Sequence, residues 1–293
     1  GESAQEHLLQ HLRDAHAVEI QALRYLERAA QHSDDDETKT VYTEHLDQTR
    51  EHEKTVKELI DAHDHTPSPL EDKTLRAGPI GLRQLADIPL NTPVNMAMSL
   101  FALEHLEIAT YELLGEIARR TDDEKTAEAA NRIVEQEREA AEKIAGTFDR
   151  AAEALSEDGR ENASEEDADD GEHAAVLSHL VDVHALEEQS LQMLQSAAEE
   201  LCEDEELKQL YREHLEQTRE HESLVNDRIE GHDAKPSAVR DLHHGAASTG
   251  LRDLAAGPPD TTVKLAMNLF CVEHLEVAAY ECMVRIAKQA GDS

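Results

Sequence analysis

The chain has 293 residues, a length that suits two domains of ordinary size, each with its own core. Its 65 acidic and 28 basic residues give a formal net charge of −37, which argues against binding to nucleic-acid phosphates or anionic membranes. Such a charge is typical of a protein kept soluble in strong salt by an acidic, halophilic surface. An acidic partner-binding face is the alternative.

The apolar residues and cysteines limit the composition of the core and the cellular compartment in which the protein is expected. Trp is absent and aromatic residues are scarce, so the core must be built from Leu, Ala, Val, Ile and Met. No apolar run approaches the roughly 18 to 20 residues that cross a bilayer, and no secretory signal begins the chain. Cys202, Cys271 and Cys282 lack CxxC spacing, and we expect buried thiols in a reducing, cytoplasmic protein.

Helical periodicity dominates the first half of the chain and predicts an all-α fold. Four helices are expected, at residues 4–31, 35–63, 93–120 and 121–155. Thr121 is the expected cap of the last helix, because acidic residues follow it in the first turn. The Gly- and Pro-containing stretch 70–93 predicts a crossover along the bundle.

A charged, Gly-containing stretch at residues 156–172 predicts an acidic flexible linker between domain 1–155 and domain 173–293. Three helices follow, at residues 172–201, 204–230 and 261–290, without a counterpart of the fourth helix. The missing helix predicts an open apolar groove. Either a longer natural chain or a helix from another subunit would fill it, and we prefer the longer chain.

The two halves are copies of each other. Residues 44–53 read EHLDQTREHE and residues 213–222 read EHLEQTREHE; the run LFxxEHLE begins at both residue 100 and residue 269. A third block, DxHAxExQ, begins at residue 14 and returns at residue 182. The offset is 168 residues at this last block and 169 at the other two, which indicates duplication of a whole domain.

Polar residues interrupt the apolar stripe of every helix in the first domain near its middle. A buried carboxylate is costly when isolated, so four interrupted stripes are better explained by one shared polar site. Carboxylates and imidazoles together are the ligands of dinuclear metal sites. The candidate metal ligands are Glu19, His16, His45, His52, Glu104, Glu107 and Glu137, and in the second domain Glu187, His184, His214, His221, Glu273 and Glu276.

The alternative is a metal-free polar core, in which buried His and Glu satisfy each other and fix the helix register. Other polar or aromatic residues are interpreted as structural or as ordinary core residues: His11, His63, His105, Tyr111 and Tyr280.

The order and spacing of these motifs carry a resemblance to a known family. They read DxHxxExQ from residue 14, HxxQTxxH from residue 45 and EHxExxxY from residue 104. The pattern resembles the ferritin-like stress-protein family typified by YciF, the DUF892 group. The resemblance implies two tandem ferritin-like antiparallel helical bundles, the second lacking its last helix. It also implies a di-metal centre, with iron as the expected metal, in proteins that tend to pair.

Two departures from that pattern bear on the metal. Gln48 and Gln217 stand where the family usually has Glu, and an amide bridges two metals poorly. The Glu-x-x-His signature of better-known di-iron proteins is also absent, since Thr49 and Ala140 stand where it needs Glu and His. Zinc, manganese or an asymmetric site are therefore alternatives to iron.

Three functions follow from these residues. One is an iron-dependent oxidase or peroxide scavenger, with Glu19, Glu104 and Glu137 bridging the ions; a second is metal storage without turnover. The third is a structural, self-assembling scaffold with metal-free cores. The expected partner is the chain itself, as an intramolecular pseudo-dimer or as a homo-oligomer that completes the second bundle.

Overall fold

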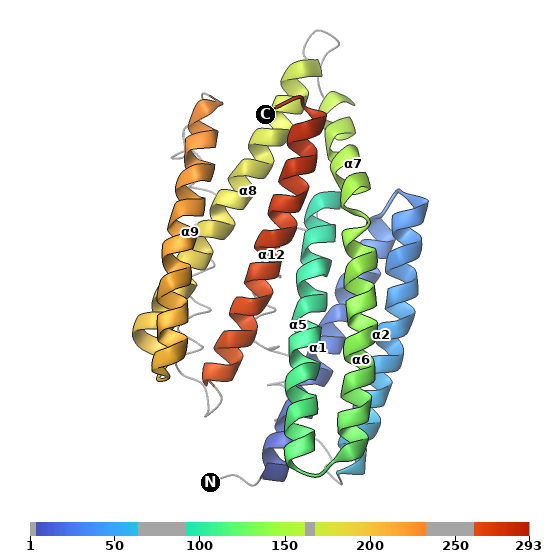
Figure 1. Ribbon diagram of the computed structural model, residues 1–293. Helices are drawn as coiled ribbons and strands as arrows, with labels where there is room; N and C mark the ends of the chain where they lie inside the picture. The colour runs from blue at the N-terminus through green and yellow to red at the C-terminus, as the bar shows by residue number, and fades with distance from the viewer. Residues whose placement is uncertain (1–3, 64–91, 162–167, 233–260, 293) are drawn as a thin grey trace. The chain divides into compact units, whose positions relative to one another are not determined.

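The computed structural model describes residues 4–63, 92–161, 168–232 and 261–292 (Figure 1). Every regular element in these ranges is a helix, which confirms the predicted all-α class. None of the described helices is long and apolar enough to cross a membrane. The chain forms two compact units, which are considered one at a time. The crossover predicted before residue 92 lies outside the described residues.

The first unit comprises Gly1–Asn91 and Asn95–Thr147, and its described residues form four long helices. Their bounds are α1 (Ala4–His32), α2 (Asp36–Ala62), α5 (Pro93–Arg120) and α6 (Glu124–Ala145). Pro93 occupies the first position of α5, where its missing N–H costs no hydrogen bond. The first three helices agree with the predicted ranges to within a few residues.

Aspartate side chains cap two of these helices. Asp35 accepts a hydrogen bond from the Thr38 N–H at 2.6 Å, and Asp123 accepts one from the Thr126 N–H at 3.0 Å. The prediction that Thr121 caps α6 is wrong. The Thr121 hydroxyl instead donates to carbonyls in the last turn of α5, and the chain then reverses at Asp122, whose φ is 58°.

Apolar side chains from all four helices form one core in this unit. Leu12, Val56, Leu114 and Ile133 come from α1, α2, α5 and α6 respectively and belong to a single buried cluster. Burying each such side chain contributes roughly 1.5–3 kcal/mol to folding. The described core therefore depends on Leu, Ile, Val and Ala, as the composition predicts.

The helix predicted from residue 121 to residue 155 is broken in the structure. α6 ends at Ala145, and α7 (Phe148–Glu161) begins after Gly146 and Thr147. Gly has low helix propensity, and the Thr147 hydroxyl and N–H both donate to the Ile144 carbonyl, which closes the last turn. Because α7 clusters with the second unit, the two halves of the predicted helix pack in different units.

The second unit consists of Thr92–Val94 and Phe148–Ser293. It contains α7, α8 (Ala168–Ser196), η1 (Ala197–Leu201), α9 (Glu205–Gly231) and α12 (Thr261–Gln289). α8 packs against α9 and α12, and α7 packs against α8 and α12. The predicted linker 156–172 thus contains the end of α7 and the start of α8, and only residues 162–167 lie outside the described part.

A single π-helical turn, η1, follows α8. The N–H of Cys202 donates to the carbonyl of Ala197 five residues earlier, at 3.1 Å. A turn of this kind accommodates one residue more than an α-helical turn. The offset between the copies changes from 168 to 169 in this part of the chain, so η1 lies where the second copy carries one extra residue.

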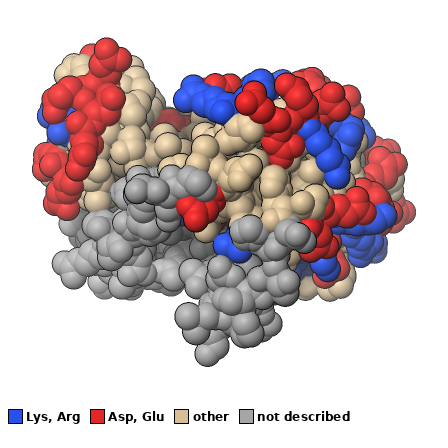
Figure 2. All heavy atoms as spheres, turned by 90° about the horizontal axis from the view of Figure 1, so that it is seen from below, with Lys and Arg blue, Asp and Glu red and all other residues tan. Residues whose placement is uncertain are grey.

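Acidic side chains are spread over the face seen in Figure 2, with Lys and Arg side chains among them. Many of the basic groups pair along one helix, as Arg120 does with Glu116 at 2.8 Å. Exposed pairs of this kind contribute only about 0.2–1 kcal/mol each. All three cysteines are free and buried, as the sequence predicts.

Replacing Asp123 with Ala is expected to destabilise the first unit by about 1 kcal/mol, because α6 loses its cap. Burial works against ionisation, but bonds from Thr126 and His63 lower the pKa of Asp123 below its usual value. The stabilisation of the first unit by the ionised Asp123 carboxylate is therefore present at neutral pH, and it is lost as the pH falls through the pKa that Asp123 has in the folded protein. Denaturant unfolding of both proteins at neutral and acidic pH measures the difference. Glu128→Ala, on the exposed face of α6, is the matched control.

Candidate metal centre

Six buried side chains meet at the middle of the first unit. They are contributed by all four helices: Glu19 by α1, His45 and His52 by α2, Glu104 and Glu107 by α5, and Glu137 by α6. The seven-residue spacing on α2 and the three-residue spacing on α5 place each pair on one helix face.

These side chains form two groups that share Glu137. One contains His45, Glu104, Glu107 and Glu137, and the other contains Glu19, His52 and Glu137. Within each group, one N or O atom per residue lies within 4.8 Å of every other. A carboxylate common to two ligand groups is the arrangement that a bridging ligand requires.

Glu137 lies between the two histidines of α2. Its carboxylate is 2.7 Å from Nδ1 of His52 and 3.5 Å from Nε2 of His45. His45 Nε2 is also 2.7 Å from Glu104. These atoms approach within ion-pair distance, and none of them has a hydrogen-bond partner.

Two amide side chains orient the histidines. The Oε1 atom of Gln48 lies 3.2 Å from His45 Nδ1, and that of Gln136 lies 3.0 Å from His52 Nε2. Because an amide oxygen can only accept, each of these ring nitrogens carries the proton. The opposite nitrogen of each ring then faces the carboxylates, as in a metal-ligating histidine.

The buried carboxylates make few hydrogen bonds. Both oxygens of Glu104, Glu107 and Glu137, and one of Glu19, lack a hydrogen-bond partner. Burial, and then the charge of Glu137, raises the pKa of Glu19 to about 8. Burial likewise raises the pKa of Glu107 well above its ordinary value. Without a metal ion, these groups must take up protons or be compensated by the histidines. Burial lowers the pKa of His45, but the Glu104 carboxylate outweighs burial and raises that pKa to about 10.

The Glu104 and Glu137 carboxylates respond differently to their histidines. Burial raises the pKa of Glu104 to about 7, although the nearby His45 lowers it. For Glu137, the contacts with His52 and His45 outweigh burial and lower the pKa. Glu137 is therefore the carboxylate that stays ionised most readily in the protein alone.

Tyr111 extends the polar site toward α1. Its hydroxyl donates a hydrogen bond to Oε1 of Glu19, and both side chains are buried. From its sequence position, Tyr111 was predicted to be a core aromatic residue. The residue is indeed part of the apolar core cluster, but its hydroxyl also positions a candidate ligand.

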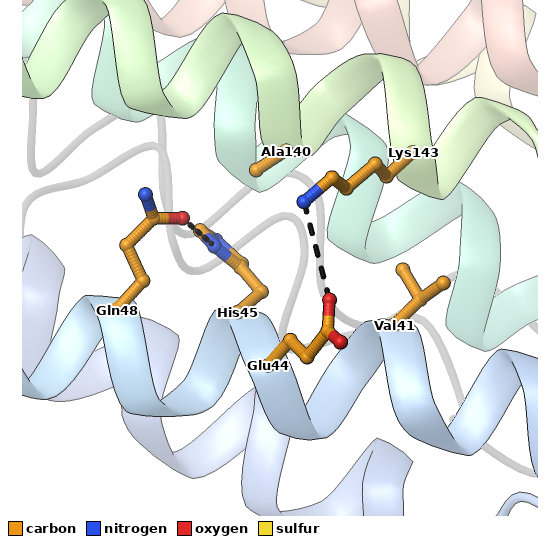
Figure 3. Close-up of a pocket in the computed structure, with 6 residues that line it drawn as sticks. All are labelled: Val41, Glu44, His45, Gln48, Ala140 and Lys143. Atoms are coloured by element: carbon orange, nitrogen blue, oxygen red, sulfur yellow. Dashed lines mark hydrogen bonds and ion pairs between the residues drawn. The ribbon is translucent and has the colours of Figure 1, made fainter.

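A cavity of about 220 Å³ lies between α2 and α6, with His45 of the centre in its wall (Figure 3). It is lined by Val41, Glu44, His45, Gln48, Ala140 and Lys143. Lys143 and Glu44 lie 4.0 Å apart at this cavity, and His45 and Gln48 form another part of its wall. A small ion or molecule in the cavity would touch a candidate ligand directly.

His16 lies apart from both groups. Its Nε2 atom is 2.8 Å from Glu53 of α2, and this pair is partly exposed. The three-residue spacing from Glu19 suggested a common site, but the ring pairs across to the neighbouring helix instead. His184 repeats the contact in the second unit, 3.0 Å from Glu222.

The second unit has a counterpart of each of the six buried side chains except Glu137, the one contributed by α6. His214, Glu273 and Glu276 lie together, with His214 Nε2 2.6 Å from Glu273. Glu187 is buried and accepts a 2.6 Å hydrogen bond from Tyr280, which repeats the Tyr111 contact. His221, however, is 46% exposed, whereas its counterpart His52 is 4% exposed.

A family model described as a domain of unknown function, DUF892, matches residues 3–156 and 173–293. The chain belongs to the DUF892 family. Both matched segments contain the motif blocks named above, so the chain is a tandem DUF892 protein. No solved structure matches the chain.

Two contacts of this DUF892 protein were not predicted. Gln48 was interpreted as a damaging departure from the family Glu, yet it bonds to His45. Gln136 was not singled out at all. Its position next to Glu137, on the buried side of α6, was the only signal in the sequence.

Tyr111→Phe is expected to cost about 1–3 kcal/mol of stability in chelator, because Glu19 loses its buried donor. Tyr280→Phe is the matched substitution in the second unit. We expect it to cost less, because Tyr280 is only partly buried and water can replace the lost bond. Calorimetry of the three proteins tests this, and an equal or larger loss in Tyr280→Phe contradicts it.

Proposed function

We propose that the first unit is a ferritin-like bundle that binds two divalent cations sharing the Glu137 carboxylate. One cation would be held by His45, Glu104 and Glu107, and the other by Glu19 and His52. The shared position of Glu137 in two ligand groups is the observation that carries this proposal. In ferritin-like di-metal proteins, each of the four helices likewise contributes ligands to the core.

Charge balance supports the same assignment. Four buried carboxylates carry four negative charges when ionised, and two divalent cations would neutralise them while both histidines stay neutral. The amides of Gln48 and Gln136 hold the proton of each ring on the nitrogen that faces away from the carboxylates, which leaves the other nitrogen for a cation. Oxygen and imidazole ligands without thiolate suit iron, manganese or zinc.

Thr49 does not contribute a ligand in this proposal. Its hydroxyl donates to the His45 carbonyl at 2.9 Å, within its own helix. The cation near His52 would therefore have fewer protein ligands than the one near His45. This asymmetry leaves coordination positions open, which is what a reacting small molecule requires.

Iron bound at such a centre would supply electrons to dioxygen or peroxide, so we propose iron and peroxide handling as the activity. The residues of this chain would exclude water, hold the ions at a fixed separation and keep Glu19 in place through Tyr111. Metal storage and a metal-free scaffold, the alternatives from the sequence, predict no turnover. The intramolecular pseudo-dimer, a homo-oligomer and a second bundle lacking its last helix also remain proposals.

Elemental analysis of protein purified without chelator or nickel is expected to find about two ions per chain in the first unit. Glu137→Ala should lose most of this metal, because both groups use that carboxylate. Glu139→Ala, on the exposed face of α6, is the control and should retain it. Metal well below one ion per chain in the wild type, not restored by reconstitution, contradicts the proposal and favours the metal-free scaffold.

Anaerobic loading with Fe(II) followed by peroxide tests the activity separately. We expect the loaded protein to oxidise its Fe(II) faster than protein-free buffer, and Glu137→Ala to behave like buffer. Absorbance and residual peroxide report the reaction. Metal binding with oxidation no faster than in buffer would leave storage as the function.

A further inference from the structure

Large apolar side chains are exposed on one pair of helices in the second unit. Among the described residues, the exposed large apolar side chains are Leu210 and Leu224 of α9 and Phe270, Val277 and Val284 of α12. Their exposed fractions range from 39% to 67%. We call this surface the α9/α12 face. An exposed apolar surface that lies along two helices is typical of a protein interaction site.

The spacing along each helix indicates a helical partner. Phe270, Val277 and Val284 follow one another at intervals of seven residues, and Leu210 and Leu224 are fourteen apart. A seven-residue repeat keeps apolar side chains along one seam against a neighbouring helix.

In the first unit, residues that correspond to these exposed side chains are covered by α6. The counterparts of Val277 and Val284 are Ile108, which is buried, and Gly115. A Cβ atom added at Gly115 would lie 3.5 Å from the Cβ of Ala130, so this row of α5 faces α6. The counterpart of Leu210 is Val41, which lines the cavity between α2 and α6.

Two basic residues of α6 pair with acidic residues of α5 and α2, and these acidic residues recur in the second unit. Arg138 of α6 lies 2.6 Å from Glu112, and Lys143 of α6 lies 4.0 Å from Glu44. The counterparts of these two acidic residues are Glu281 and Glu213, which are both retained. Glu281 pairs with Arg285 of its own helix and Glu213 accepts a hydrogen bond from Gln209, so an α6-like helix would share these two acidic groups with those neighbours.

The histidines that flank the α6 carboxylate are retained as well. His45 and His52 have the counterparts His214 and His221, and both counterparts are more exposed. α7 does not take this place, because it packs against α8 and α12 rather than α9.

We propose that the α9/α12 face binds an amphipathic helix of the α6 type. Such a helix carries Ala, Ile and Val on one side, a central glutamate that lies beside His214 and His221, and Arg and Lys that pair with Glu281 and Glu213. The proposal does not depend on metal in the first unit, since the histidines alone can hold the carboxylate.

A fluorescent peptide of residues 121–147 is the probe, added to the full chain in the presence of chelator. We expect saturable binding with a Kd in the micromolar range, about −8 kcal/mol at 1 M standard state. Peptide helicity should rise on binding. Replacing Glu137 with Gln in the peptide should weaken binding about tenfold, because the amide lacks the negative charge that would face the two histidines.

Substitutions in the protein locate the binding surface. Val277→Asp/Val284→Asp should abolish binding, and because both side chains are half exposed the thermal unfolding should be unchanged. Gln192→Asp/Gln195→Asp adds the same charge on exposed positions of α8 and should leave binding intact.

Three results would overturn the proposal. One is no saturable binding up to millimolar peptide. Another is binding that survives Val277→Asp/Val284→Asp, which would indicate exchange into the first unit. The third is self-association of the full chain, measured by sedimentation, that Val277→Asp/Val284→Asp abolishes. That result would mean that a second copy of the chain covers the α9/α12 face.

Discussion

Glu137 lies between His45 and His52 in the interior of the first unit, and the polar core around it depends on this contact. A carboxylate buried without partners would cost several kcal/mol, so α6 can pack only where both histidines of α2 receive it. The contact thereby fixes the register of α6 against α2. Because Glu137 belongs to both ligand groups, the same contact also brings Glu19 of α1 and Glu104 of α5 toward one centre.

Much of this arrangement could be predicted from the sequence, because duplication repeats the motif blocks at a nearly constant offset. The all-α class and the bounds of the first three helices follow from periodicity. The carboxylates that interrupt the apolar stripes converge in the structure, since four stripes of one bundle must face the same axis. What spacing could not predict was the direction of each ring: His16 and Glu19 share a helix face, yet His16 contacts Glu53.

Other features depend on the orientation of individual side chains or on local backbone geometry. Gln48 was interpreted as a lost ligand because its residue type differs from the family; it lies three residues after His45 on α2, but the spacing does not show that its amide contacts the ring. The break after Ala145 was missed because the apolar stripe continues through Phe148. Periodicity is the same on both sides of Gly146, so only packing decides that α7 belongs to the other unit.

The π-helical turn at Ala197–Leu201 has a consequence for aligning the two copies. An inserted residue in a continuous α-helix would rotate all that follows by about 100°, but here the wider turn absorbs it before α9 begins at Glu205. Contacts on both sides of the turn therefore recur in the two copies, as the Tyr111–Glu19 and Tyr280–Glu187 hydrogen bonds do. An alignment without gaps, using 169 residues throughout, would pair Glu187 with Val18 and miss its counterpart, Glu19. Aligning the two copies thus requires a one-residue gap in the first copy, opposite η1.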